Sequence, residues 1–401
     1  MRVVLAADFP VHCLPGFEDR PVGHHATWLG PLSGELTSKP DLDLHWITCT
    51  KETRAYREIH HLGQTFHLLP RGRLSVEMLT RFRGERKQIA ALTRRLQPEL
   101  FHGWGTEQGY ALAANDFGES SLISLQGILN AYCKASRMPL LARVQASAEK
   151  SALARTRSLT VESPWGADQL KKLAPQARIH LLEYGVDLAC FDLSRIPDPR
   201  PRAVFVGSFN HLKGGDTLLK AFLDPRLAGI KLDIYGVADP SLVPAQVPSH
   251  IQFHGHRSRH EVRQAMAAAW CLVHPTRADT SPNAVKEARV IGLPVVTSSA
   301  GGQTQYVQHG ESGFIHAPDD IDALIEGVLH LTASPEINQL MGSHDQEHCR
   351  QLLDPARTAE NLIRIYGEEH GAKRGETRAT AGGSMELREA RREQQPGEAW
   401  S

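Results

Sequence analysis

The stretch AVFVGSFNHLKGGDTLLKAF, residues 203–222, decides the fold class because it contains the parts of an α/β unit in order. It opens with an apolar run rich in valine and phenylalanine, which is typical of a buried strand. Gly207, Gly214 and Gly215 follow, and glycines let a backbone approach a ligand closely. Lys213 stands before the helical pattern, where its ammonium group could neutralise a phosphate. The stretch therefore predicts a strand, a phosphate-binding loop and a helix.

Short apolar runs alternate with helical patterns on both sides of this unit, which predicts parallel sheets built from βαβ units. Expected strands cover residues 2–8, 44–50, 99–104, 121–127, 158–163, 203–209, 231–236, 251–255, 270–275, 293–299 and 313–317. Expected helices cover residues 87–96, 215–223, 258–270 and most of 337–370. The predicted fold class is α/β, with two doubly wound Rossmann-like domains facing each other across a cleft that binds the ligand.

Three prolines between residues 192 and 202 mark the boundary of the two halves, because proline removes backbone donors and favours extended chain. The predicted organisation is a first domain (1–190), a linker (191–202), a second domain (203–358), a helix that crosses back to the first domain (359–370) and a disordered tail (371–401). The tail contains too few large apolar side chains to offset the entropy of ordering.

The composition excludes several classes of protein. Lys and Arg number 45 and so do Asp and Glu, so no net charge attracts the chain to nucleic acid. Six scattered cysteines form no CxxC pair, and the densest histidine groups lack zinc spacing, so no metal site is expected. Without a signal-peptide pattern or a run of ~20 apolar residues, a cytoplasmic protein is expected.

A second stretch, DTSPNAVKEARVIGLPVV (279–296), predicts an anion-binding helix start. Ser281 is a suitable N-cap, Pro282 suits the first helical position, and Gly292 would end the helix. The free amides of a helix start carry partial positive charge and suit a phosphate. In this stretch the free amides are those near Asn283, Ala284 and Val285.

Two carboxylates flank that helix start. Asp279 lies just outside the helix, where it could accept hydrogen bonds from a sugar hydroxyl. Glu287 lies more than a turn inside and could reach a ribose diol. The spacing suits a nucleotide diphospho-sugar, and an ordinary amphipathic helix with a capping serine is the alternative.

These stretches, extended to HPTRADTSPNAVKEARVIGLPVVTSSAGGQTQYVQHGESGF (274–314), resemble the donor-binding half of retaining glycosyltransferases of family 4, which have the GT-B fold. The resemblance is specific over roughly residues 203–320, in motif order, separation and flanking strands. The first half resembles the family more weakly, through residues 21–29, 102–114 and 160–170.

The resemblance implies metal-independent transfer of a sugar from a nucleotide donor, such as a UDP-, GDP- or ADP-sugar, with retention at the anomeric carbon. It makes Lys213 the phosphate-binding lysine, Asp279 the acid at the transferred sugar and Glu287 the acid at the ribose. It assigns further donor contacts to Gly207, Ser208, His256, Thr280, Ser281, Pro282, Asn283 and Ala284.

Four positions depart from the family pattern. Ser208 replaces an arginine that would supply a phosphate cation, and Asp279 is one methylene shorter than the usual glutamate. Gln305 replaces an acid after the Gly301–Gly302 turn, and Gln126 replaces a histidine of the first domain. These changes leave open the donor, and they also leave open a non-catalytic relative.

Acceptor-side candidates are fewer in the first half. Gly23 and His24 occupy the position of a glycine-rich turn, and a plain loop glycine is the alternative. His102, with Trp104 and Glu107 after it, should stand at a strand end facing the cleft. A histidine in a structural hydrogen bond explains that position equally well, and the acceptor itself stays unidentified.

The stretch from Arg71 to Arg95 carries eight Lys/Arg against two Glu. Leu74, Met78 and Phe82 recur every four residues, which predicts a helix with one apolar face. Such a helix could contact an anionic membrane peripherally. A solvated face over the domain core is the alternative.

Three other functions stay open on the sequence. A nucleotide-sugar epimerase and a sugar phosphorylase share the fold, although no pyridoxal lysine motif supports the second. A binding module that holds a nucleotide sugar without turnover is the third.

Overall fold

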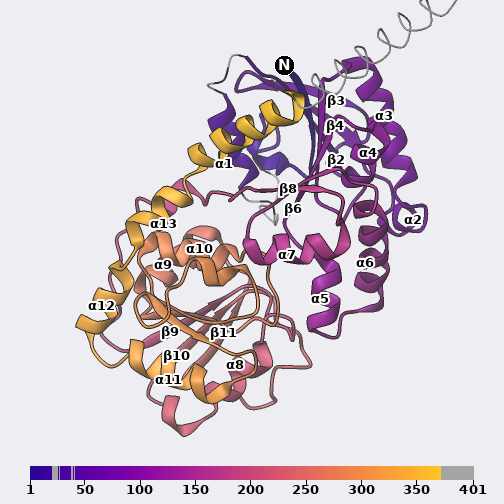
Figure 1. Ribbon diagram of the computed structural model, residues 1–401. Coiled ribbons are helices and arrows are strands. Elements are labelled where there is room, and N and C mark those ends of the chain that lie inside the picture. The colour runs from indigo at the N-terminus through magenta and orange to yellow at the C-terminus, as the bar shows by residue number, and fades with distance from the viewer. Residues whose placement is uncertain (20–25, 27, 38, 40, 372–401) are drawn as a thin grey trace, which may run out of the picture.

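The computed structural model describes residues 1–19, 26, 28–37, 39 and 41–371, which form two β-sheets flanked by helices (Figure 1). The first sheet has the strand order β3 (Arg57–His61), β4 (Gln64–Pro70), β2 (Asp43–Thr50), β1 (Arg2–Ala6), β5 (Leu100–Trp104), β6 (Ser121–Leu125), β7 (Ser158–Val161) and β8 (Arg178–Leu181). Its strands pair in parallel, except that β3 pairs with β4 antiparallel.

The second sheet is parallel in every pair. Its order is β11 (Ile251–Gly255), β10 (Lys231–Tyr235), β9 (Arg202–Val206), β12 (Cys271–His274), β13 (Val295–Ser298) and β14 (Gly313–His316). In both sheets the order reverses beside the first strand of the domain, β1 or β9. Such a switch point opens a crevice at the carboxyl ends of the strands.

Helices cover both faces of each sheet, and buried apolar clusters lie between them. The first domain has α1 (Leu29–Leu36), α2 (Leu74–Leu79), α3 (Arg83–Leu96), α4 (Tyr110–Phe117), α5 (Leu129–Ala135), α6 (Leu140–Leu153) and α7 (Pro164–Leu173). The second has α8 (Gly215–Phe222), α9 (Arg259–Ala268), α10 (Asn283–Ile291), α11 (Ile321–Leu331), α12 (Pro335–Ser343) and α13 (Gln346–Leu352).

The two-domain α/β prediction is confirmed, and each expected strand has a counterpart. The sequence did not predict β3, β4 and β8. Strand β3 is mostly exposed and β8 has no fully buried residue, so neither carries the apolar run that marks a central strand. The domain boundaries drawn from composition stay a prediction.

The prediction of one amphipathic helix through Phe82 is wrong. Helix α2 ends at Leu79, and Arg81 and Phe82 have left-handed backbone angles, with φ of 52° and 54°. Phe82 is buried whereas Leu74 is 43% exposed, so the residues of the predicted apolar face do not pack together.

A helix over residues 355–371 returns to the first sheet and is drawn in yellow in Figure 1. Leu362 and Tyr366 pack in the core of the first domain, and the Tyr366 hydroxyl lies 2.8 Å from His102 Nδ1. From residue 372 the predicted disordered tail lies outside the described residues. Within the described part of the chain, no helix combines the length and apolarity needed to cross a membrane.

Candidate functional site

Lys213 and Asp279 form an ion pair at the carboxyl end of the second sheet. Lys213 lies in the turn between β9 and α8, where its amide donates to Asn210 Oδ1 at 2.9 Å. Asp279 follows β12, and His274 Nε2 lies 3.3 Å from its Oδ2. The structure thus brings together two residues that lie 66 positions apart in the sequence.

The Asp279 side chain is a carboxylate in a nearly closed environment. Only 6% of the residue is exposed, and burial alone would raise its pKa. Lys213 and His274 outweigh that effect and hold the pKa of Asp279 below its ordinary value. Burial lowers the pKa of His274. Lys213 is therefore already partnered by a buried carboxylate.

The start of α10 differs by one residue from the prediction. Pro282 is the N-cap and Asn283 the first helical residue, so Ser281 does not cap the helix. The Ser281 hydroxyl lies instead 2.7 Å from the Tyr306 hydroxyl. The Val285 amide donates to the Pro282 carbonyl at 3.0 Å, so it is not free to bind a ligand, contrary to the prediction. First-turn amides lack intrahelical acceptors, which leaves those of Asn283 and Ala284 for an anion. Gly292 ends the helix as predicted.

The Gly301–Gly302 turn packs directly on the backbone of Asp279 and Thr280. The Gly302 amide donates to the Asp279 carbonyl at 2.9 Å. A Cβ at Gly302 would lie 2.0 Å from the Thr280 carbonyl oxygen, so no larger residue fits. Gly301 has a φ of 150°, which side chains disfavour. The turn therefore fixes the backbone that carries Asp279.

Residues of the first domain contact the same loop. The Tyr132 hydroxyl, from α5, lies 2.9 Å from Thr280 Oγ1 and accepts from the Thr280 amide at 3.3 Å. The Ser163 hydroxyl, at the N-cap of α7, donates to the Thr280 carbonyl at 2.6 Å. The ion pair of Lys213 and Asp279 thus lies where the two domains meet. Neither Tyr132 nor Ser163 was among the site residues predicted from the sequence.

A second ion pair joins the domains and was not predicted. Lys286 of α10 lies 2.5 Å from the carboxylate of Glu162, which follows β7, and both side chains are almost fully buried. Lys286 also donates to the Tyr184 carbonyl at 3.1 Å. Burial raises the pKa of Glu162 although Lys286 opposes the shift.

Glu287 lies in a different charge group from Lys213. It is partly buried on α10, and burial raises its pKa against the opposing charges of Arg259 and Arg263. Both arginines, on α9, also pair with Asp187, at 3.3 Å and 2.9 Å. Glu287 therefore lies beside two cations, which were not among the site residues predicted from the sequence.

Ser208 lines a cleft of about 670 Å³ between the domains. The first domain contributes residues 136–139, including Arg137, and the second contributes residues 208, 210–212 and 237–240. Arg137 is exposed and comes from the loop before α6. An arginine of the first domain therefore lines the same cleft as Ser208.

Gln126 lines a smaller cavity of about 270 Å³ in the first domain, together with Asp8, Trp104 and Glu107. Burial raises the pKa of Glu107 to about 7. Gly127, also in the lining, would place a Cβ 3.3 Å from the Tyr132 hydroxyl, so this cavity adjoins the contact between Tyr132 and Thr280.

The structure decides one acceptor-side alternative and leaves two residues unplaced. His102 is fully buried, with Nδ1 2.8 Å from the Tyr366 hydroxyl and Nε2 2.7 Å from the Ser124 hydroxyl. His102 thus takes part in structural hydrogen bonds and is not open to an acceptor. Gly23 and His24 lie outside the described residues.

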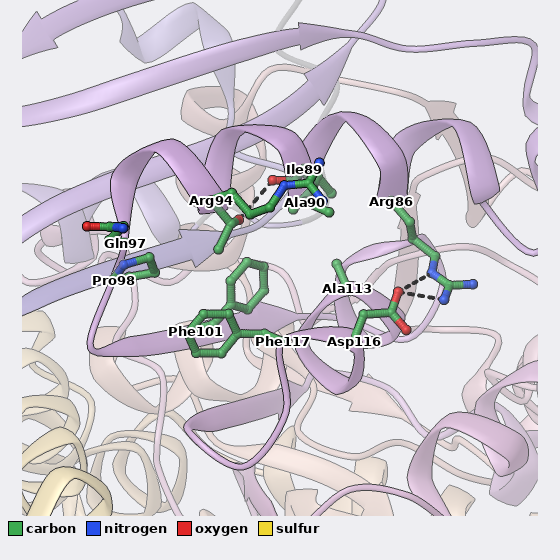
Figure 2. A pocket seen from close by; sticks show the side chains of 11 residues that line it. Arg86, Ile89, Ala90, Arg94, Gln97, Pro98, Phe101, Ala113, Asp116 and Phe117 are labelled. Atoms are coloured by element: carbon green, nitrogen blue, oxygen red, sulfur yellow. Dashed lines mark hydrogen bonds and ion pairs between the residues drawn. The ribbon is translucent and has the colours of Figure 1, made fainter.

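His256 is exposed after β11, which keeps it accessible to a ligand. Among the described residues, no group of three or more His, Cys, Asp or Glu is arranged to hold a metal ion. A separate cavity of about 450 Å³ lies between α3 and α4, over the stacked rings of Phe101 and Phe117 (Figure 2). Arg86 and Asp116 pair at its edge, and it includes none of the predicted site residues.

Comparison with known sequences agrees with this geometry. Residues 200–334 match the family model described as glycosyl transferases group 1. A D-inositol 3-phosphate glycosyltransferase of Actinosynnema mirum is 24% identical over 267 residues, 59% of this chain and 63% of the relative. One from Catenulispora acidiphila is 29% identical over 224 residues, 47% of this chain and 54% of the relative. The chain thus spans less than two thirds of the length of these curated relatives.

Solved structures share the fold over almost the whole chain. Sucrose-phosphate synthase from Thermosynechococcus elongatus superposes with a TM-score of 0.76 at 17% identity, covering 93% of this chain and 100% of that one. Anabaena HepE in complex with UDP-glucose gives 0.62 at 14% identity, covering 92% and 100%. WaaG, described as a glycosyltransferase of lipopolysaccharide biosynthesis, gives 0.62 at 16% identity, covering 89% and 98%. Residues 200–334 are therefore similar to the glycosyl transferases group 1 family, and the chain as a whole has the two-domain GT-B fold of these solved structures.

Proposed function

We propose that this protein is a retaining glycosyltransferase, which moves a sugar from a nucleotide diphospho-sugar to a hydroxyl acceptor. The observation that supports this most is the ion pair of Lys213 and Asp279 beside the start of α10. The carboxylate of this pair belongs to the loop that leads into the helix start, at the junction of the domains. The solved relative bound to UDP-glucose has the same fold and supports a nucleotide sugar as donor.

Each group has a role in this proposal. The amides of Asn283 and Ala284 hold the diphosphate, and Lys213 neutralises the charge that grows on it as the sugar departs. Asp279 accepts a hydrogen bond from a hydroxyl of the transferred sugar. Glu287 accepts hydrogen bonds from the ribose.

The reaction proceeds by attack on the same face of the sugar. The bond between the anomeric carbon and the diphosphate oxygen breaks, and a bond to the acceptor oxygen forms. The acceptor proton passes to the departing phosphate oxygen, so the enzyme needs no separate base. Lys213 stabilises the diphosphate throughout, because electrostatic stabilisation of a leaving anion is a large part of such catalysis.

A donor panel tests the proposal directly. The protein is incubated with UDP-, GDP- and ADP-sugars, and thermal shift and release of the nucleoside diphosphate are measured. One donor is expected to raise the melting temperature and to be hydrolysed slowly without an acceptor. With an acceptor found by screening, proton NMR is expected to report the donor's anomeric configuration in the product. An inverted product would contradict the retaining assignment.

A non-catalytic binding protein is the second candidate, and Ser208 in the cleft favours it because a phosphate cation is absent at that position. Tight binding of one nucleotide sugar without any release of diphosphate would support this candidate against the enzyme. Conversion of the donor to its epimer would instead identify a nucleotide-sugar epimerase. The sugar, the base and the acceptor are the variables of these experiments.

A further inference from the structure

Exposed apolar side chains gather on two helices of the first domain. Of the fifteen large apolar side chains that are exposed in the described chain, six belong to α2 and α6: Leu74, Val76, Leu79, Leu140, Leu141 and Val144. Leu79 is 87% exposed and Leu140 is 75% exposed. Apolar side chains exposed singly are normal, but a group of them marks an interaction surface.

One short loop, residues 107–109, contacts both regions and brings them to the same side of the domain. Gln145 of α6 donates to the Glu107 carbonyl at 3.4 Å. A Cβ at Gly109 would lie 2.9 Å from the Cβ of Phe82, the residue between α2 and α3. Figure 1 draws α2 and α6 on this same side. We call the exposed side chains of residues 73–87 and 140–150 the α2–α6 surface.

The charges of the α2–α6 surface have one sign. Its exposed charged side chains are all basic: Arg73, Arg81, Arg83, Lys87, Arg143 and Lys150. Its acids Glu77, Glu85 and Glu149 are buried. Glu85 pairs with Arg71 at 3.1 Å, and Glu149 accepts from the Thr106 hydroxyl at 2.8 Å. The chain has no formal net charge, so this basic surface is a local feature.

We propose that the α2–α6 surface docks on an anionic lipid bilayer. Exposed leucine and valine side chains would enter the headgroup boundary, while arginine and lysine contact anionic headgroups. A second copy of the chain fits less well, because two basic surfaces repel each other. The docking needs no catalytic activity, and it would use two helices of the first domain rather than the single helix that the basic stretch predicted.

Docking in this way would bring the interdomain cleft close to the bilayer. Pro139 immediately precedes α6 and lines the cleft that also contains Ser208. If the proposed transferase function holds, the cleft would then face acceptors that are anchored in lipid. This consequence rests on the proposed function, whereas the docking itself does not.

Vesicle flotation of the full chain, without donor or acceptor, tests the docking. The protein is expected to float with phosphatidylglycerol vesicles at low salt and to be released at high salt. It should not float with pure phosphatidylcholine. The pair Leu79→Ser with Leu140→Ser, and the pair Arg83→Glu with Arg143→Glu, should each weaken binding by about tenfold or more. The control pair Ile196→Ser with Leu340→Ser removes side chains of 75% and 71% exposure outside this surface and should bind as wild type.

Several outcomes would overturn the proposal. These are absence of flotation by the wild type at low salt, equal binding to both vesicle types, or an equal loss in the control pair. Self-association in light scattering that the same substitutions abolish would assign the surface to a second copy. Thermal melting shows whether each variant is folded. If a double variant melts at a lower temperature than wild type, the single variant Leu140→Ser is used to repeat the flotation test.

Discussion

Lys286 and Glu162 form an ion pair that is buried between the two domains, with a separation of 2.5 Å. Removing one partner of a buried pair leaves an uncompensated charge away from water. Lys286→Met is therefore expected to lower the free energy of unfolding by about 3–5 kcal/mol. Urea denaturation, followed by fluorescence at pH 7, measures the change.

Lys220→Met is the matched control, because Lys220 is exposed on α8 and should lose less than about 0.5 kcal/mol. Replacing both partners, as Lys286→Met with Glu162→Leu, should recover part of the loss, since no unpaired charge remains. A Lys286→Met protein as stable as wild type would mean that the Glu162 carboxylate is not buried against this ammonium group in solution.

Lys213→Ala is expected to lower kcat by about 10²–10³ with the preferred donor, because the leaving diphosphate loses a cation. Lys213→Arg keeps the charge and should lose less. The measurement is the initial rate of nucleoside diphosphate release, with Lys220→Ala as the control for removal of a lysine. A change in kcat within about threefold would exclude the proposed role of Lys213.

His102 predicts a pH dependence of stability. It is fully buried, and burial lowers its pKa to about 3. Above its ordinary pKa of about 6.5 the ring is neutral in both the folded and the unfolded protein, so it does not lower the free energy of unfolding. As the pH falls below 6.5, the unfolded ring gains a proton that the folded ring does not, so stability decreases. At pH 5 this group should contribute a loss of about 2 kcal/mol.

His102→Gln removes that proton uptake. The variant is expected to be less stable than wild type at pH 7.5, because it loses the ring's hydrogen bonds to Tyr366 and Ser124. The difference between the two proteins should then shrink as the pH falls to 5. Urea midpoints at a series of pH values measure it, and a constant difference would contradict a buried, neutral His102.

The sequence predicted the sheets and the second-domain loop because central parallel strands and glycine turns leave local patterns. It identified Lys213 and Asp279 separately, but their pairing depends on how β9 and β12 lie side by side. The contact of Tyr132 with Thr280 joins two domains and has no local signal at all. Helix α10 starts one residue later than predicted, because the Ser281 hydroxyl contacts the Tyr306 hydroxyl and does not cap the helix amides.

Arg137 and Ser208 come from opposite domains and line the same cleft. We expect Arg137 to supply the phosphate cation that Ser208 lacks, so Arg137→Ala should lower kcat/KM for the donor by about 10- to 100-fold. Arg143→Ala, an exposed arginine of α6, is the control and should leave the soluble assay unchanged. Adding Ser208→Arg to Arg137→Ala places a cation on the other wall of the cleft and is expected to restore part of the activity. Full activity of Arg137→Ala would exclude this role. A loss without rescue would mean that Arg137 supports the loop before α6 and not the diphosphate.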